Sequence, residues 1–274
     1  MPYPILTLPF PFARRLCQLL TPEELQNVQI AAGHEIEKLK PIVKSIENKD
    51  TLFHFADSKI ECVDFNEHSE VLSYLTEDST LVKCKTAMFQ TLTGSTFKNI
   101  DLTKIHLKTE ELTFTMCNIS IDILKSIASR IPAKHEVREF LLFQTRTDEN
   151  INFPLVFGLF PNLKKIRFNQ AYEGWLDDLS NINVVQLEYL CVQHTKLNEL
   201  FHFKPEELLG FIKKQSPEFR LNIVFACPPG ANLLQVSKVI MVFLKPHFDI
   251  LNGKYKIDVH NGSSQVWLTF YNTY

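Results

Sequence analysis

The sequence predicts an α/β protein, in which a small N-terminal helical module precedes a larger domain with a mainly parallel sheet. Three observations support this prediction. A helical apolar stripe with a capping signal lies near the N-terminus, strand-like segments recur every 24 to 26 residues, and helix-like stretches separate them. Of the 274 residues, 45% are hydrophobic, so the chain can bury a sizeable core.

The predicted N-terminal module covers residues 1–47 and consists of three short helices. The first has apolar residues at helical spacing on one face: Phe12, Leu16, Leu19 and Leu20. The second begins at Thr21-Pro22-Glu23-Glu24, where Thr21 suits the N-cap and Glu24 suits the position of a capping-box carboxylate. Gly33 is expected to end it. Apolar spacing predicts a third helix, bent or restarted at Pro41, with these residues on one side: Ile36, Leu39, Val43 and Ile46.

This segment resembles an F-box over about 40 residues. Leu8-Pro9 is followed in register by Leu20, Thr21-Pro22 and Leu25. Val28 and Ala31 also fall on apolar positions of that family, but the closing aromatic residue is replaced by the stretch 34–39. The resemblance implies docking to a Skp-type adaptor and cullin complex. The residues that it assigns to adaptor binding are Leu8, Pro9, Leu16, Leu20, Leu25 and Val28.

The remaining chain, residues 48–274, shows a repeated strand pattern. Four segments with a leucine-rich cadence begin at Leu112, Val137, Leu163 and Leu187. Their spacing lies in the range of leucine-rich repeats, and the copies are degenerate. Helices are predicted at 121–130, 153–160, 205–215 and 233–244. Strands are predicted at 219–227, 254–259 and 265–270, the last two joined by a hairpin at Asn261-Gly262. An ordinary α/β sandwich would show a similar rhythm.

The region from Asp50 to Glu111 is harder to interpret. Alternating apolar residues predict strands at 60–65 and 81–88, and a short helix is expected at 71–75. The only plausible domain boundary lies at Glu47–Asp50.

Alternation along the repeated strands predicts an open sheet face. The residues expected there as substrate contacts are Lys165, Arg167, Tyr189 and Gln193. The same phase brings four apolar side chains to the face, and we expect the chain itself to cover them: Phe114, Met116, Leu141 and Phe143.

The order of segments also resembles the F-box-associated region of F-box proteins that are expanded in nematodes. The matching segments are Trp175-Leu176 with Leu179, 187–192, Leu208 with Phe211-Ile212-Lys213, and 219–225. This resemblance implies a substrate-recognition adaptor of a cullin-based (SCF-type) ubiquitin ligase that binds an unidentified protein substrate.

Composition and motifs argue against several other classes. The formal net charge of −2 makes nucleic acid a poor partner, and no apolar run is long enough for a membrane span. Six scattered cysteines and the absence of a signal-peptide pattern favour a cytoplasmic or nuclear location.

No phosphate loop, metalloprotease motif or nucleophile elbow is present, so we expect no catalytic residues, cofactor or metal. Cys191 and His194 are close in sequence but are interpreted as a strand residue and a loop residue. Two alternatives remain: a small α/β enzyme with a site at the carboxyl ends of its strands, and a structural protein-interaction module unrelated to ubiquitin.

Overall fold

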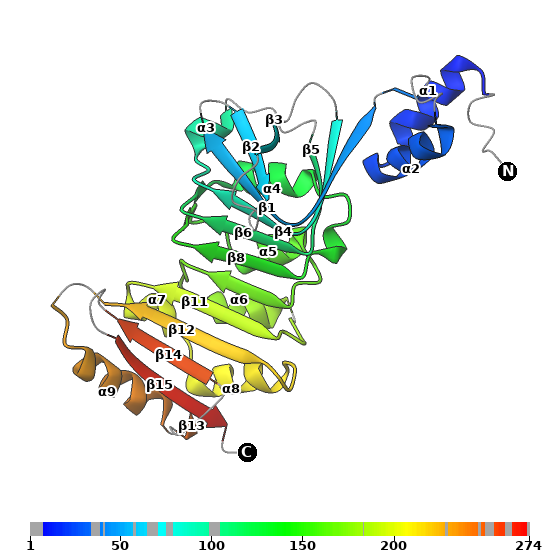
Figure 1. Ribbon diagram of the computed structural model, residues 1–274. Helices are drawn as coiled ribbons and strands as arrows, with labels where there is room; N and C mark the ends of the chain where they lie inside the picture. Colours follow the sequence, from blue (N-terminus) through cyan, green and yellow to red (C-terminus); the bar gives the residue numbers. More distant parts are fainter. Residues whose placement is uncertain are drawn as a thin grey trace. The chain divides into compact units, whose positions relative to one another are not determined.

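The computed structural model describes residues 8–33, 39–40, 42–56, 59–64, 71–74, 79–98, 105–182, 184–227, 230–245, 248–249, 255–260 and 265–272. The chain divides into two compact units. Figure 1 labels their helices and strands. Unit 1 comprises Met1–Leu112 and Cys117–Glu136, and unit 2 comprises Thr113–Met116 and Val137–Tyr274. The protein is therefore α/β, as the sequence predicts.

Unit 1 begins with two helices, α1 (Phe10–Leu19) and α2 (Pro22–Ala32). The capping box is present: the Glu24 backbone N–H donates to the Thr21 hydroxyl, and the Thr21 backbone N–H donates to the Glu24 carboxylate at 2.8 Å. Gly33 ends α2 with a φ of 58°, a conformation that glycine adopts without strain. These predicted helix signals are confirmed.

The sheet of unit 1 mixes parallel and antiparallel pairs. Its strands are β1 (Val43–Ala56), β2 (Lys59–Asp64), β3 (Val71–Tyr74), β4 (Ser79–Gln90) and β5 (Ile105–Lys108), in the order β3-β2-β1-β4-β5. The β1–β4 and β4–β5 pairs are parallel, whereas β1–β2 and β2–β3 are antiparallel. Unit 1 also contains α3 (Gly94–Lys98), β7 (Asn118–Ile119), α4 (Ile121–Ser129) and a 3₁₀ turn at Lys134–Glu136.

Three sequence predictions need correction here. The third helix is wrong where it includes Val43 and Ile46, because both residues lie in β1 and pair with β4. Pro41 precedes this strand, and proline cannot continue a helix ladder. The segment 71–74 is the strand β3 rather than a short helix. Finally, the boundary expected at Glu47–Asp50 falls inside β1, and residues 34–38 lie outside the described residues.

Unit 2 is a sheet with parallel pairing along most of its width. The strands β8 (Glu139–Phe143), β10 (Lys165–Phe168), β11 (Tyr189–His194), β12 (Arg220–Ala226) and β14 (Tyr255–His260) pair in this order, all parallel. β15 (Gln265–Asn272) and β13 (Phe248–Asp249) extend it with antiparallel pairs. β6 (Glu111–Thr115) enters unit 2 at Thr113, and β9 (Arg146–Thr147) is a short separate strand.

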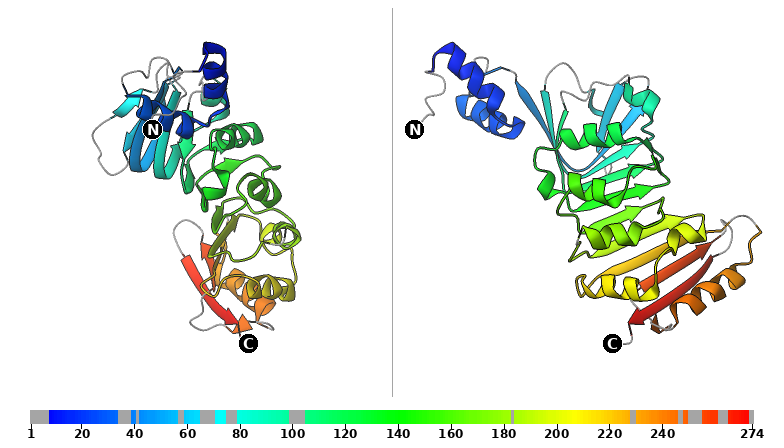
Figure 2. Two further views of the ribbon diagram at one scale, coloured as in Figure 1. Left: turned by 90° about the vertical axis from the view of Figure 1, so that its right-hand side faces the viewer. Right: turned by 180° about the vertical axis from the view of Figure 1, so that it is seen from behind.

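Helices cover one face of the unit 2 sheet (Figure 2). They are α5 (Phe153–Leu159), α6 (Trp175–Asn181), α7 (Leu197–Leu200), α8 (Pro205–Lys213) and α9 (Leu233–Leu244). The side chains that the strands send toward this layer are fully buried, and they include Phe140, Ile166, Phe168, Leu190, Val192 and Ile223. The predicted alternation of strands and helices is confirmed for this part of the chain, including the antiparallel β14–β15 pair.

Two strands of unit 2 end in the same way. Met116 and Gln144 directly follow β6 and β8, and their φ angles are 52° and 48°. The Met116 backbone N–H donates to the Phe143 carbonyl at 2.9 Å, and the buried Thr145 hydroxyl lies 3.0 Å from the Phe114 carbonyl. A left-handed residue after each strand therefore turns the chain back toward the core at matching positions.

Among the described residues, no helix is long and apolar enough to span a membrane.

Candidate functional site

Within the described residues of unit 2, the sheet face without helices contains all four residues predicted as substrate contacts. Figure 1 shows this face toward the viewer, and the right-hand view of Figure 2 shows the helices on the opposite face. Ile166 and Phe168 of β10 point into the buried layer, so the alternating residues Lys165 and Arg167 point to the open face. Tyr189 and Gln193 occupy the corresponding positions of β11.

Parallel pairing arranges these side chains in rows across the strands. One row contains Glu139, Lys165, Tyr189 and Arg220, from β8 to β12. The next row contains Leu141, Arg167, Cys191 and Asn222. Arg220 and Asn222 were not among the predicted site residues. Extending the same alternation into the predicted strand 219–227 would have identified both.

Arg167 lies in the middle of this face without a carboxylate partner among the described residues. Its guanidinium carbon is 4.8 Å from the centre of the Phe143 ring, which is the geometry of a cation–π contact. Its neighbours in the row, Leu141 and Cys191, are uncharged. The side chain is half-buried, so its positive charge is both partly desolvated and unneutralised by the part of the chain that the structure describes.

Lys165 differs from Arg167 because its charge is already neutralised. The Lys165 ammonium donates to the Glu139 carboxylate at 2.7 Å, from the neighbouring strand of the same row. Both side chains are partly exposed, so this pair adds little to stability. Of the two predicted cationic contacts, Arg167 is therefore the one whose charge is available to a partner.

Tyr189 forms a polar cluster with its neighbours on β11 and β12. Burial raises the pKa of the Tyr189 hydroxyl to about 12, and the adjacent Cys191 acts in the same direction. Hydrogen bonding from Asn222 and the positive charge of Arg167 oppose this rise. Tyr189 therefore stays neutral at physiological pH. Gln193 is half-buried and lies opposite Val224 of β12.

The apolar residues predicted for this face behave differently from one another. The prediction is wrong for Phe114, which is completely buried on the same side of β6 as Leu112. In β6 the leucine that begins the cadence already lies inside the strand, whereas in the later repeats it precedes the strand by two residues, so the phase shifts. The chain was expected to cover Met116 as well, but 46% of this residue is exposed. Leu141 and Phe143 are half-buried.

A second candidate surface lies on the two N-terminal helices of unit 1. The rest of unit 1 covers only one edge of the apolar stripe of α1. Cys17 is buried in a small core with Leu25, Leu39, Val43 and Leu81, and the stripe residues Leu16 and Leu20 pack against that core. The other edge of the stripe is open, because Phe12 is 66% exposed and Leu19 is 67% exposed.

The remaining residues assigned to adaptor binding divide between surface and core. Leu8 and Pro9 are exposed, Val28 is packed against the small core, and Leu25 is buried within it. Ile30 of α2 is 70% exposed and was not predicted as a contact. Leu8, Phe12, Leu19 and Ile30 thus form the exposed apolar set of the helix pair, and we call it the helix-pair surface.

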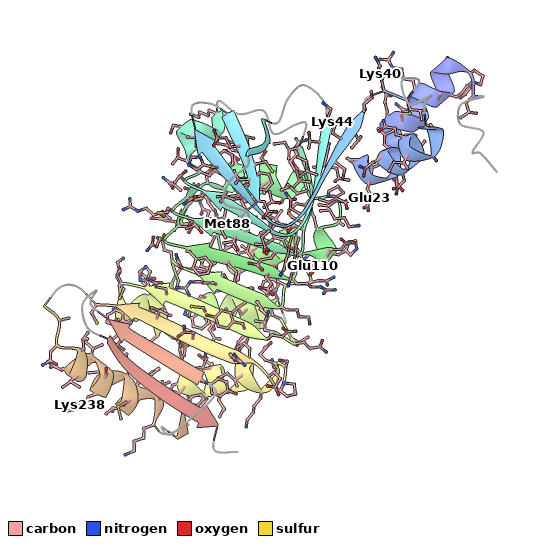
Figure 3. All side chains as sticks on the ribbon, in the orientation of Figure 1. Glu23, Lys40, Lys44, Met88, Glu110 and Lys238 are labelled. Carbon is pink, nitrogen blue, oxygen red and sulfur yellow. The ribbon has the colours of Figure 1, made fainter. Side chains whose placement is uncertain are left out.

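Two polar contacts attach the helix pair to the unit 1 sheet. Gln29 is buried, and its side-chain amide donates to the Leu39 carbonyl at 2.7 Å while accepting from the Val43 N–H at 3.0 Å. The Lys108 ammonium donates to Glu23, which Figure 3 labels on α2, at 2.8 Å. The helices therefore pack against strands of the same unit.

Unit 1 also has an open polar pocket of about 520 Å³. Its charged lining residues are Glu47, Lys49, Lys83, Lys85, Lys108, Glu110 and Glu136. Lys83 donates to Glu47 at 2.8 Å, which holds the pKa of that carboxyl below its usual value. Because ammonium and carboxylate groups nearly balance in number, the pocket shows no clear preference for a ligand of either sign.

The structure does not bring the cysteine–histidine candidates together. Cys191 lies at an open-face position of β11, and His194 lies at a position of the opposite phase. The Lys196 backbone N–H donates to the His194 ring at 3.0 Å. Within the described residues, no group of three or more histidine, cysteine, aspartate or glutamate side chains has a geometry suited to a metal ion.

Comparison with known proteins gives no significant match. No protein-family model, no curated protein and no solved structure matches this chain.

Proposed function

We propose that the chain is a substrate-recognition adaptor of a cullin-based ubiquitin ligase. In this proposal the helix-pair surface docks to a Skp-type adaptor, and the open sheet face of unit 2 binds a protein substrate. The proposal assigns no catalytic step to the chain itself. The observation that carries it is the uncovered edge of the α1 stripe, where Phe12 and Leu19 are exposed beside the Leu8-Pro9 entry.

The exposed apolar area of the helix pair can drive the binding of a partner. Fully burying a leucine, isoleucine or phenylalanine side chain stabilises by about 1.5 to 3 kcal/mol. The helix-pair surface exposes four such side chains on a short segment, whereas scattered single residues would be ordinary. Of these four residues, Leu8 belongs to the F-box resemblance, where it begins the pattern together with Pro9.

The repeated strand ends of unit 2 support the leucine-rich-repeat-like part of the proposal. Met116 and Gln144 adopt the same left-handed conformation after successive strands, and a buried residue follows each. Such regular turning is typical of repeat domains, in which each unit buries its apolar face against the next.

One feature departs from the family pattern and shapes the experiment. Where an F-box would continue into a third helix, this chain enters β1 at Val43, and Leu39 and Val43 share a core with the helix pair. The helix pair is therefore not self-contained. A variant that disturbs its core would affect adaptor binding and the unit 1 sheet together, so the test must use exposed residues.

The test uses the full chain and a purified Skp-type adaptor. Two double variants, Leu8→Ala with Pro9→Ala and Phe12→Ala with Leu19→Ala, remove exposed side chains from the helix-pair surface. Anchors at the centre of an interface often cost about 2 kcal/mol each when truncated, so we expect affinity to fall at least about thirtyfold. The matched control is Leu234→Ala with Val239→Ala, which truncates exposed apolar residues of α9 in unit 2.

Binding and thermal unfolding are measured on the same samples. The proposal requires weaker adaptor binding by both helix-pair variants with an unchanged unfolding temperature, and unchanged binding by the α9 control. Adaptor binding that is absent in the wild type, or equal in all variants, would sink the proposal.

A second candidate is a structural interaction protein in which α1 and α2 cap the sheet of unit 1. The Gln29 bridge and the Glu23–Lys108 ion pair favour it, because both tie the helices to strands. This candidate predicts no adaptor binding and a loss of unit 1 stability when α1 and α2 are deleted from the full chain.

A further inference from the structure

We propose that the open face of the unit 2 sheet recognises an acidic, extended segment of a partner protein, with Arg167 as the central anchor and Arg220 as a second contact. The juxtaposition that carries this is a half-buried arginine that lies over an aromatic ring, between two uncharged neighbours and with another arginine two strands away. The inference rests on the proposed function only in naming that segment as part of the substrate.

The charges of the face favour an acidic partner. At the open-face positions of β8, β10, β11 and β12, the charged residues are Glu139, Lys165, Arg167 and Arg220. Glu139 and Lys165 neutralise each other at 2.7 Å. The structure gives neither Arg167 nor Arg220 an ion pair with any carboxylate of the described residues. These four strands are therefore locally positive on the open face, although the chain has a net charge of −2.

Arg167 is prepared for a planar anion. Guanidinium groups bind carboxylates through two parallel hydrogen bonds, and contact with an aromatic ring restricts the motion of the guanidinium beforehand. Phe143 supplies this ring at 4.8 Å. The surrounding Leu141, Phe143 and buried Cys191 lower the local exposure to water, which strengthens the attraction between Arg167 and an incoming carboxylate.

The two arginines also define a spacing. Arg220 shares a row with Lys165, and Arg167 lies one row further along the same face and two strands away. With strands about 4.8 Å apart and about 6.6 Å between alternate residues, the two Cα atoms are separated by about 12 Å. In an extended peptide, carboxylates about four residues apart have a similar separation of about 13 Å. The favoured segment therefore carries two acidic residues at this interval.

The polar groups around Arg167 suit a peptide backbone better than a bare ion. Tyr189 and Asn222 interact with each other, and Gln193 lies on the same face of β11. Amide and hydroxyl groups of this kind both donate and accept hydrogen bonds, as peptide groups do. A partner that is an extended protein segment can satisfy them while its acidic side chains reach the arginines.

The test measures binding of labelled peptides to the full chain by fluorescence anisotropy. The probe is a serine- and glycine-rich peptide of about ten residues with two glutamates about four residues apart. Its analogues have glutamine at both positions, phosphoserine at both positions, or glutamates at adjacent positions. We expect the spaced glutamate peptide to bind at least about tenfold more tightly than the glutamine analogue, since one tenfold step corresponds to about 1.4 kcal/mol.

Arg167→Gln is expected to remove this discrimination, and Arg220→Gln, at an exposed position, to reduce it severalfold. Arg167→Lys keeps the charge but loses the planar fork, so it should restore only part of the affinity. The matched control is Arg138→Gln, which makes the same charge change at an exposed residue of unit 2 that precedes β8. Thermal unfolding of each variant shows that it is folded.

Three outcomes would overturn the inference. The first is equal binding of the glutamate and glutamine peptides. The second is an equal effect of Arg138→Gln and Arg167→Gln, which would mean that peptide binding depends only on the net charge of the protein. The third is much tighter, Arg167-dependent binding of the phosphoserine peptide, which would assign the face to phosphorylated segments instead. Adaptor binding is measured on the same samples, and Arg167→Gln should leave it unchanged, so a failure of the proposed function is seen separately.

Discussion

The helix-pair surface of unit 1 and the open sheet face of unit 2 are both uncovered in the part of the chain that the structure describes, but their chemistry is opposite. The first exposes the apolar side chains of Leu8, Phe12, Leu19 and Ile30, with the exposed Arg15 on the same face of α1 as Phe12 and Leu19. The second presents Arg167, Tyr189, Gln193 and Asn222 among half-buried apolar residues. A mainly apolar surface binds through area removed from water, whereas a polar face binds through matched charges and hydrogen bonds.

This difference predicts how each surface chooses its partner. Apolar burial is non-directional and only weakly affected by salt, which suits one constant partner such as an adaptor. Charge recognition is screened over about 8 to 10 Å at physiological ionic strength, which suits a selective and reversible partner. The two regions should also differ in the interactions that stabilise them.

The largest expected effect comes from Leu25→Asp in α2. Leu25 is buried in the core that joins the helix pair to the sheet, so a carboxylate there loses its hydration without gaining a partner. We expect a loss of roughly 3 kcal/mol or more in the free energy of unfolding, with adaptor binding lost as well. The matched control is Ile30→Asp, on the exposed side of the same helix.

Chemical denaturation of both variants decides this prediction. Ile30→Asp should change the free energy of unfolding by less than about 0.5 kcal/mol while still weakening adaptor binding. If Ile30→Asp destabilises as strongly as Leu25→Asp, the helix-pair surface is part of a core and is not a free binding surface.

A smaller effect is expected from Gln29→Ala. The Gln29 side chain satisfies the Leu39 carbonyl and the Val43 N–H where the chain enters β1. Removing it leaves both backbone groups without this partner, at an expected cost of about 1 to 3 kcal/mol. Gln26→Ala is the control, since Gln26 is also buried on α2 but its side-chain oxygen has no hydrogen-bond partner. Equal losses in the two variants, measured by denaturation, would contradict the assigned role of the Gln29 bridge.

The sheet face is tested by its response to alkaline pH. The pKa of Tyr189 is raised to about 12 in the folded chain, above the usual value of 10.0 for tyrosine. The folded state therefore holds the proton more tightly, and this contribution to stability is complete below about pH 10 and is lost as the pH rises toward 12. Tyr189→Phe should be less sensitive to this range than the wild type.

Thermal unfolding between about pH 8 and pH 12 measures the effect, and tyrosinate absorbance reports the ionisation directly. Tyr172 also has a raised pKa because of burial, so the comparison must be between Tyr189→Phe and Tyr172→Phe rather than with the wild type alone. An unchanged tyrosinate titration in Tyr189→Phe near pH 12 would show that the polar cluster of the sheet face is not formed as described.

Sequence alone predicted the fold better in unit 2 than in unit 1. Strands β8, β10 and β11 follow a regular cadence, and α9 was predicted with its observed ends. In unit 1 the residues Val43 and Ile46 are three positions apart, which fits the spacing of a helix face but places them on opposite faces of a strand. Their pairing with β4 decides the outcome, and long-range pairing of this kind leaves no local signal.

The candidate site shows the same limit. Alternation placed Lys165, Arg167, Tyr189 and Gln193 on one face, but it could not separate the paired lysine from the unpaired arginine. That distinction depends on Glu139 and Phe143, which belong to a different strand. Alternation also failed for Phe114, because the start of β6 is shifted relative to the leucine cadence.

The smallest expected effect concerns the capping box at the start of α2. Thr21→Ala removes the hydroxyl that accepts from the Glu24 backbone N–H, and we expect the free energy of unfolding to fall by about 1 kcal/mol.

Hydrogen bonds from the Thr21 backbone and hydroxyl lower the pKa of Glu24 below its usual value of 4.5. Because the folded state favours the ionised carboxylate, its contribution is present above pH 4.5 and is lost as the pH falls below that value. Glu24→Gln should therefore unfold at a lower temperature than the wild type at neutral pH, and the difference should shrink at about pH 3. Glu218→Gln makes the same charge change at an exposed turn residue of unit 2 and is the control for the loss of a surface carboxylate. A difference for Glu24→Gln that persists unchanged in acid would mean that the side chain acts through packing and not through its charge. Pro22 and the buried Leu25 would then be the residues that stabilise the start of α2.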